Sequence, residues 1–501
     1  MSEKMDRLKA ILAESVALTQ ALGLLSWDRE TYMPEGAAEA RGQQLGVLAK
    51  IQHEMFTSAE VGTLLEALSA ETADLDPDSD EARLIKVTKR DYEQFSKVPS
   101  SLVQEMQQGT AEGITAWHHA KQEQDFKLFA PALKRNNDIS RRLADALGYE
   151  ERPYDAFVNI FEPGMSTAQL ETIFSELKEA IVPLVREIVK HQDAVDDSFL
   201  FQHYDKQTQL DFSMTMAKQY GYDTHRGRLD LTAHPFMQSM SRDDVRITTR
   251  VLPNFLNACL FAVLHETGHA LYEQGVSPDL NFTTLAGGTS AGVHESQSRL
   301  WENLVGRSRP FQDFLFPRLQ ETYPQQLGNV DVERFYRAVN KVYPSYIRVE
   351  ADEVTYNLHV LLRFELESAM LEGRIDIDTL EEAWNDKMQE YLGIVPSNPV
   401  EGVLQDIHWA WGQGYSFPGY TVGNVVGAQL FAQAHKDMPD LNDQIARGEF
   451  SNLLHWLQTN VYQHGRKFDA NELAQRITGE PVSTRAWREY VTTKFPKIYG
   501  F

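Results

Sequence analysis

The sequence predicts a mainly α-helical fold with a small β-sheet. Apolar residues recur with a helical period in several long stretches, among them 170–188 and 358–370. Strand-like composition is confined to a short region before residue 252. With 42% hydrophobic and 24% charged residues, the 501-residue chain has the composition of a globular protein. We therefore expect a single large helical unit, residues 1–501, that buries an extensive core.

The N-terminal segment is charged and runs directly into helical sequence. Apolar residues follow with a helical period at Met5, Leu8, Ile11, Leu12 and Ala13. A secretory signal would show an uninterrupted apolar stretch here, so the sequence indicates no export. Apolar stretches such as 258–264 fall far short of the roughly 20 residues that span a bilayer, which predicts no membrane segment. The single cysteine, Cys259, allows no internal disulfide and fits a reducing, cytoplasmic location.

Two features organise the next part of the chain. The acidic segment 73–82, ADLDPDSDEA, contains Pro and Ser but no apolar period, so it predicts a linker between two helices. Further on, Ser166 and Gln169 form a capping-box pattern that begins a helix with one apolar face extending to Ile188. Within this helix Pro183 predicts a kink.

Two short segments have the composition of strands. Residues 227–232 and 245–251 carry β-branched side chains around a turn-like Ser-Arg-Asp-Asp. They predict a hairpin or short sheet. Since they come just before the candidate metal-binding motif, residues 265–269, we expect the sheet to lie near that motif.

The clearest motif for metal chemistry is His265-Glu266-Thr-Gly-His269. On a helix, positions i and i+4 lie one turn apart on one face, so both imidazoles reach one metal while the glutamate between them faces its water. The apolar, proline-free segment 257–264 and the later Gly275 support a helix here. The alternative is a solvated or buried helix whose two histidines bind nothing.

A hydrolytic zinc site needs three protein ligands and an open position for water. A third histidine at the spacing of the longer metzincin motif is excluded, because Tyr272 and Gly275 occupy the positions where that motif needs Gly and His. The helical segment 291–301, which follows a Gly-rich loop, offers Glu295 instead. Glu302 lies two turns further on the same face and is the second candidate. The neighbours of Glu295 are candidates for contacts behind the metal.

The net charge of the chain and the types of its candidate metal ligands argue against several classes of protein. A net charge of −24 repels phosphate backbones and anionic membranes, so neither nucleic acid nor a membrane surface is expected as a partner. Two histidines and a carboxylate also occur in non-haem iron oxygenases, but Glu266 would have no role there. A catalytically dead scaffold is disfavoured because Glu266 is intact. An aminopeptidase or oligoendopeptidase remains as a rival of different specificity.

Six short motifs follow one another along the chain. They are His234-Pro235-Phe236, Asp244-Val245-Arg246-Ile247-Thr248, His265-Glu266-Thr267-Gly268-His269, His294-Glu295-Ser296, Ile347-Arg348-Val349-Glu350-Ala351-Asp352 and Gly402-Val403-Leu404-Gln405-Asp406-Ile407-His408-Trp409. In these motifs, and in Ser26-Trp27-Asp28 with Met33-Pro34, the sequence resembles the carboxypeptidase Taq family of metallocarboxypeptidases. The resemblance covers essentially the whole chain.

The resemblance implies a two-lobed helical fold with a deep central active-site groove. We place an N-terminal helical lobe at about residues 1–160 and the groove region at about 161–501. It further implies a homodimer that removes amino acids one at a time from peptide C-termini, with broad side-chain specificity. It also implies that zinc is bound by the two histidines and Glu295, with Glu266 as catalytic base. Apart from the resemblance, cobalt or manganese are possible substitutes for zinc.

A carboxypeptidase must recognise a free terminal carboxylate, for which a guanidinium is the natural donor. Arg348 and Arg246 lie in the matched motifs; we favour Arg348 for the carboxylate and Arg246 for shaping the groove. The alternative is that each arginine only forms a structural ion pair, with Asp352 or Asp244 respectively.

The oxyanion that develops during hydrolysis needs a donor besides zinc. His408 and Tyr420 are the candidates, although Tyr420, in a Gly- and Pro-containing loop, would serve equally well as a packing residue. Asp406 is a candidate for orienting a histidine. We expect His234 either to bind substrate or to brace the small sheet.

Overall fold

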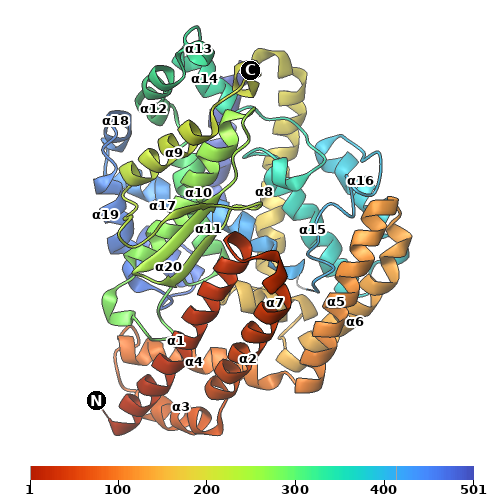
Figure 1. Ribbon diagram of the computed structural model, residues 1–501, viewed down its shortest axis with the longest axis vertical. Coiled ribbons are helices and arrows are strands. Elements are labelled where there is room, and N and C mark those ends of the chain that lie inside the picture. Colours follow the sequence, from red (N-terminus) through yellow and green to blue (C-terminus); the bar gives the residue numbers. More distant parts are fainter. Residues whose placement is uncertain (1, 413) are drawn as a thin grey trace.

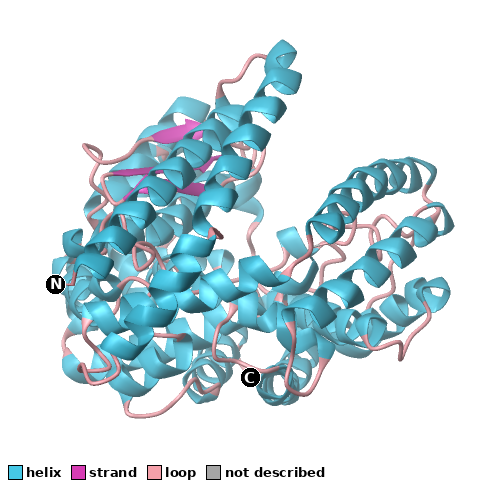
Figure 2. Cartoon of the chain, turned by 90° about the horizontal axis from the view of Figure 1, so that it is seen from below, coloured by secondary structure: helices cyan, strands magenta, loops and turns pink. Residues whose placement is uncertain are grey.

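The computed structural model describes residues 2–412 and 414–501. Most of these residues lie in α-helices, and one three-stranded sheet is present among them (Figures 1 and 2). The predicted mainly α-helical fold with a small sheet is confirmed. The boundaries of two lobes and the deep groove stay predictions.

The N-terminal part consists of helices joined by short turns. The bounds are α1 Glu3–Thr31, α2 Ala38–Phe56, α3 Ala59–Glu71, α4 Asp80–Lys97, α5 Ser100–Glu123, α6 Ala130–Leu147 and α7 Pro153–Phe161. α1 packs along α2, and α5 packs along α6 as a second pair at the lower right of Figure 1. The predicted linker, residues 73–82, joins α3 to α4 as expected, but its last three residues already belong to α4, which Ser79 caps.

Helix α1 departs from one expectation drawn from the sequence. Within the described residues it alone is long and apolar enough to cross a membrane, so the expectation that no stretch has this length and composition is wrong. Core helices of soluble proteins and signal sequences meet the same criterion, and the evidence for a membrane is therefore weak. In this structure α1 packs against α2, α3 and a strand of the sheet.

The middle of the chain contains the predicted capped helix and the sheet. The bounds are α8 Thr167–Lys190, α9 Lys206–Tyr220, β1 Leu229–Leu231, β2 Met237–Ser241 and β3 Asp244–Thr249. The capping box of Ser166 and Gln169 is confirmed, and α8 runs on through Pro183. In the sheet, order β1-β3-β2, β3 is parallel to β1 and antiparallel to β2. The two predicted strands are present, but the hairpin joins β3 to β2, which composition did not reveal.

Three neighbouring helices carry the predicted metal ligands, Glu266 and Tyr420 (Figure 1). They are α10 Leu256–Gly275, α11 Ala291–Arg299 and α17 Pro418–Asp437. A π-helical turn, Leu300–Val305, continues α11, and such turns recur at functional sites. Helix α15, Tyr356–Leu371, packs against α17.

The remaining helices complete the main core. Their bounds are α12 Arg309–Thr322, α13 Pro324–Leu327, α14 Val332–Val339, α16 Leu380–Leu392, α18 Leu441–Arg447, α19 Ser451–Asn460, α20 Ala470–Thr478 and α21 Arg485–Tyr499. The main core draws on residues from Leu102 to Tyr499. A second, smaller core is formed by α1, α3 and α4 with Phe56 of α2 and three later residues, Val276, Leu280 and Leu285.

Candidate metal centre

Three side chains from two adjacent helices converge on one point. His265 and His269 lie one turn apart on α10, and Glu295 comes from α11. Glu295 Oε2 lies 3.6 Å from His265 Nε2 and 3.3 Å from His269 Nε2. Ligands about 2.1 Å from a tetrahedral zinc ion stand about 3.4 Å apart, so these separations fit such an ion. The sequence-predicted trio is therefore brought together.

The two oxygens of Glu295 have different partners. Oε1 accepts a hydrogen bond from Arg299 Nε at 2.7 Å, one turn further along α11. Oε2 faces the histidines and accepts from Ser298 Oγ at 3.0 Å. Burial would raise the pKa of Glu295, but the charge of Arg299 and the neighbouring histidines hold it well below its usual range. The carboxylate is thus kept ionised, the form that binds metal.

Glu302 lies behind His265. Its Oε2 is 2.9 Å from His265 Nδ1, which leaves Nε2 directed toward the site. Burial opposes the ionisation of Glu302, but its hydrogen bond with His265 and the charge of Arg299 lower its pKa to about 2. Glu302 is therefore the carboxylate that orients a ligand, and not a member of the trio. The π-helical turn that carries it was not visible in the sequence.

His269 has a longer supporting chain. Its Nδ1 is 2.6 Å from Nδ1 of His294, and Nε2 of His294 is 2.9 Å from Glu273 Oε1. The backbone N–H of Gly288 also donates to Glu273 Oε1. Burial lowers the pKa of His269 to about 4, so its imidazole is neutral and able to bind metal. A neighbour of Glu295 thus contacts a ligand from behind, as predicted.

Glu266 follows His265 on α10, and its side chain is buried. Burial raises its pKa to about 7; His265 opposes the rise, and the charges of Glu295 and Glu302 add to it. A carboxyl group with a pKa near the working pH exchanges protons readily in both directions, which is the property of a general base.

Glycines allow the ligand-bearing helices to meet. A Cβ at Gly268, inside the histidine motif, would lie 2.5 Å from the carbonyl oxygen of Gln297 on α11. A Cβ at Gly423 of α17 would lie 2.6 Å from Cγ of Glu295. The backbones of α10 and α17 therefore approach α11 closely because these positions lack a side chain.

Arg348 is buried against a carboxylate. Its Nε and Nη2 donate to Asp406 at 3.0 and 3.1 Å, and its Nη1 donates to the Tyr356 hydroxyl at 2.7 Å. The ion-pair partner is thus Asp406 and not the Asp352 that the sequence suggested. Asp406 also forms an ion pair with Arg363, whose Nη2 lies 2.9 Å from Asp406 Oδ2. Its carboxylate is occupied by two arginines, so the predicted orientation of a histidine is wrong.

Tyr420 and His408 lie near this pair. Tyr420 sits in the first turn of α17 and not in a loop, and Arg348 Cζ lies 5.5 Å from the centre of its ring. Burial raises the pKa of the Tyr420 hydroxyl, which keeps it a proton donor. Nδ1 of His408 is buried without a hydrogen-bond partner, and its ring packs 4.6 Å from that of Phe417.

Arg246 and His234 belong to the sheet region. Arg246, on β3, forms two 2.8 Å hydrogen bonds to Asp244, and its Cζ lies 4.4 Å from the ring centre of Trp27. The sequence-suggested ion pair with Asp244 is therefore present. His234 is exposed between β1 and β2. In the described part of the chain neither residue is hydrogen-bonded to the ligand trio.

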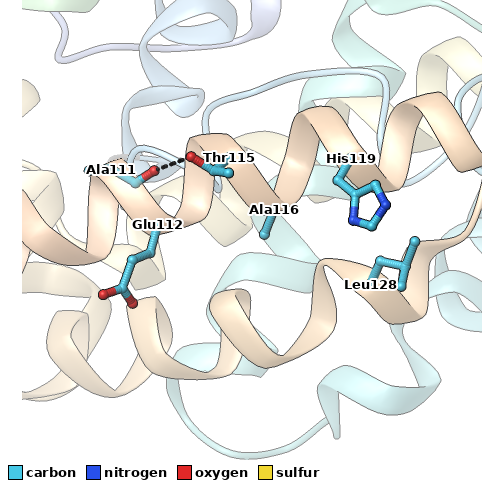
Figure 3. A pocket seen from close by; sticks show the side chains of 6 residues that line it. All are labelled: Ala111, Glu112, Thr115, Ala116, His119 and Leu128. Atoms are coloured by element: carbon cyan, nitrogen blue, oxygen red, sulfur yellow. Dashed lines mark hydrogen bonds between the residues drawn. The ribbon is translucent and has the colours of Figure 1, made fainter.

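A pocket of about 540 Å³ lies elsewhere, on the outer side of α5. It is lined by Ala111, Glu112, Thr115, Ala116, His119 and Leu128 (Figure 3). Thr115 Oγ1 is bound to the carbonyl of Ala111 at 3.0 Å, and Glu112 is paired with Arg135. These polar groups are satisfied within or beside α5, and the pocket shares no residue with the metal centre.

A metallopeptidase site is defined by two imidazoles one helical turn apart, a carboxylate from the next helix and a buried glutamate that follows the first histidine in the sequence. The family described as carboxypeptidase Taq (M32) metallopeptidase matches residues 7–495. The chain belongs to this family. It is a metallocarboxypeptidase that carries the His265, His269 and Glu295 metal-ligand group.

Full-length relatives agree with this assignment. Carboxypeptidase 1 of Bacillus subtilis (strain 168) is 37% identical over 481 residues, 96% of each chain. Thermostable carboxypeptidase 1 of Thermus thermophilus is 40% identical over 497 residues, 97% of each chain. The crystal structure of the M32 carboxypeptidase from Deinococcus radiodurans R1 matches with a TM-score of 0.97 and 41% identity over the whole of both chains.

Proposed function

We propose that the protein is a zinc carboxypeptidase that removes residues one at a time from the free C-terminus of peptides, with broad side-chain specificity. The observation that carries the proposal is the trio of His265, His269 and Glu295, whose ligand atoms are spaced as a zinc ion requires. The names of the Bacillus and Thermus relatives support the exopeptidase specificity.

The donor set favours zinc among the common divalent ions. Two imidazoles and one carboxylate suit zinc, whereas magnesium and calcium prefer oxygen donors alone. Cobalt and manganese accept the same donors and are possible substitutes. When bound, such a metal supplies Lewis acidity toward the scissile carbonyl and lowers the pKa of a water molecule.

Glu266 is the proposed proton carrier. Its carboxylate accepts a proton from the attacking water, and the resulting carboxyl group donates that proton to the leaving amine. A pKa of about 7 favours both steps, because neither protonation state of Glu266 is strongly preferred near neutral pH. Tyr420 and His408 are the proposed donors to the developing oxyanion, and the protonated hydroxyl of Tyr420 supports that role.

Arg348 is the proposed receptor for the peptide's terminal carboxylate. It is linked to the metal centre through two side chains: Tyr356, whose hydroxyl it contacts, and Arg299, whose Cζ lies 4.7 Å from the ring centre of Tyr356. Arg299 in turn holds Glu295. We propose that Arg246 shapes the groove and that His234 either contacts the substrate or braces the sheet.

The first experiment compares three versions of one short peptide: unmodified, N-terminally acetylated and C-terminally amidated. Released amino acids are followed by mass spectrometry with and without chelator. A carboxypeptidase shortens the first two stepwise from the C-terminus, spares the amidated peptide and stops when chelator is added. Internal or N-terminal cleavage would overturn the proposed specificity, and absence of cleavage by metal-loaded protein would favour an oxygenase or a scaffold.

Two variants test the assigned roles. Glu266→Gln should retain metal, measured by elemental analysis, and lose turnover by a factor of about 10² to 10⁴. Arg348→Ala should raise KM for free-carboxylate peptides and leave metal content unchanged. Loss of metal in the first variant, or an unchanged KM in the second, would contradict these roles.

We also propose a homodimer located in the cytoplasm, on the family resemblance and the single buried cysteine. Sedimentation equilibrium at several protein concentrations tests the dimer, since a monomer at all concentrations would refute it.

A further inference from the structure

The proposed carboxylate receptor is already neutralised by a carboxylate of the protein. Arg348 binds Asp406 with two nitrogens, and both residues are less than one-tenth exposed. A guanidinium in a closed pair with Asp406 presents little net charge to a second carboxylate. Binding a peptide carboxylate there requires a further positive charge close to the pair.

Arg363 provides such a charge. It lies on α15, is fully buried, and its Nη2 is 2.9 Å from Asp406 Oδ2. Rings surround its Cζ, with centres at 5.0, 4.8 and 4.5 Å that belong to Trp384, Trp409 and Phe417. The rings stabilise the cation through their π faces without neutralising it. Asp406 therefore lies between two arginines.

The other ionisable groups near Arg363 do not cancel its charge at neutral pH. Burial raises the pKa of Glu367, one turn along α15, to about 8, although Arg363 and hydrogen bonds from Trp409 and Tyr154 oppose the rise. Burial lowers the pKa of His359 to about 3, so this imidazole is neutral. Burial also lowers the pKa of Arg363, but a guanidinium stays protonated in proteins. The cluster is thus left with one unbalanced positive charge.

We propose that Arg363 is a positioning residue for substrate recognition: it shares Asp406 with Arg348 and supplies the net positive charge that lets Arg348 hold a peptide's C-terminal carboxylate. The inference rests on the proposed role of Arg348. Arg363 itself is buried behind Asp406 and acts through it, without touching the substrate. Asp406 then fixes the plane of the Arg348 guanidinium while Arg363 offsets the negative charge of Asp406.

The test is a double-mutant cycle on the charges. Arg363→Met keeps an unbranched side chain among the rings and removes the charge. If the bound carboxylate lies about 8 Å from Arg363, removing one unit charge at an effective dielectric constant of about 20 should raise KM for a peptide with a free C-terminus roughly thirtyfold. The change should appear mainly in KM. Adding Asp406→Asn to Arg363→Met restores the net charge and should recover most of the lost affinity.

A second readout isolates carboxylate binding from catalysis. We would measure competitive inhibition by an N-acetylated amino acid and by its amide, which differ only in the terminal charge. Arg363→Met should weaken the acid and leave the amide unchanged, and Arg363→Lys should restore binding of the acid. If acid and amide weaken equally, or if Arg363→Lys behaves like Arg363→Met, the charge argument is wrong.

A matched control addresses simple destabilisation. Lys494→Met also removes a buried cation from an ion pair, with Glu353 at 2.9 Å, but Lys494 lies on α21 and Glu353 lies just before α15. It should lower the melting temperature without changing discrimination between acid and amide.

The Arg348→Ala variant distinguishes failure of the role of Arg363 from failure of the role of Arg348. If Arg348→Ala abolishes that discrimination and Arg363→Met preserves it, only the role of Arg363 fails. If Arg348→Ala preserves it, the proposed carboxylate receptor fails as well.

Discussion

Replacing Gly423 with alanine tests whether helix packing sets the position of Glu295. The new Cβ would lie 2.6 Å from Cγ and 2.7 Å from Cβ of Glu295. Real Cβ atoms do not approach this closely, so α17 and α11 must separate or Glu295 must leave its rotamer. Overpacking of this kind costs about 1–3 kcal/mol, and the better helix propensity of alanine returns about 1 kcal/mol. We expect a metal-free protein destabilised by at most about 2 kcal/mol.

The affinity for metal should fall more than the stability of the protein, because the displaced side chain, Glu295, is a metal ligand. We expect zinc affinity, measured by competition with a chelator, to fall about 10- to 100-fold, as for residues that orient metal ligands. Gly46→Ala is the control: Gly46 lies in α2 with no atom near its virtual Cβ, so alanine should stabilise the protein by about 1 kcal/mol and leave zinc affinity unchanged. If Gly423→Ala behaves like Gly46→Ala in both measurements, close packing does not position Glu295.

Three further predictions follow from the site and its surroundings. Glu302→Gln should weaken zinc binding about tenfold or more, measured by chelator competition, because His265 loses its carboxylate partner; unchanged affinity would show that Glu302 does not orient His265. Zinc at about 100 times its Kd should raise the free energy of unfolding by about 2.7 kcal/mol, measured by thermal unfolding with and without chelator; an unaffected melting temperature would argue against a structured site. Glu367 has its pKa raised in the folded protein from 4.5 to about 8, so its contribution to stability is present below about pH 4.5 and is lost as the pH rises toward 8. Glu367→Gln should therefore reduce the loss of stability between pH 5 and 8, and an unchanged pH profile would contradict the raised pKa.

The metal centre could be predicted from the sequence because its signals are local. His265 and His269 are one helical turn apart, and Glu295 follows a Gly-rich loop on a short helix. Helical periodicity fixes which side such residues face. The same reasoning gave the capped start of α8 at Ser166.

The features that could not be predicted from the sequence depend on contacts between distant segments. β2, Met-Gln-Ser-Met-Ser, lacks β-branched residues and forms because β3 offers it a partner. Arg363 looks like any charged residue of an amphipathic helix until Asp406, 43 positions later, is brought beside it. The need for glycine at Gly268 comes from the backbone of α11, which no local pattern describes.

The smaller hydrophobic core has a consequence for how the molecule opens. Apart from Val276, Leu280 and Leu285, its residues all come from the first 87 positions, so it is built mostly from contacts between neighbours in sequence. Such a unit can lose and regain its structure while the main core stays folded. Backbone amides of α1 and α3 should therefore exchange with deuterated solvent through openings smaller than global unfolding. Zinc binding in the main core should slow exchange in α10 and α11 and leave that in α3 nearly unchanged.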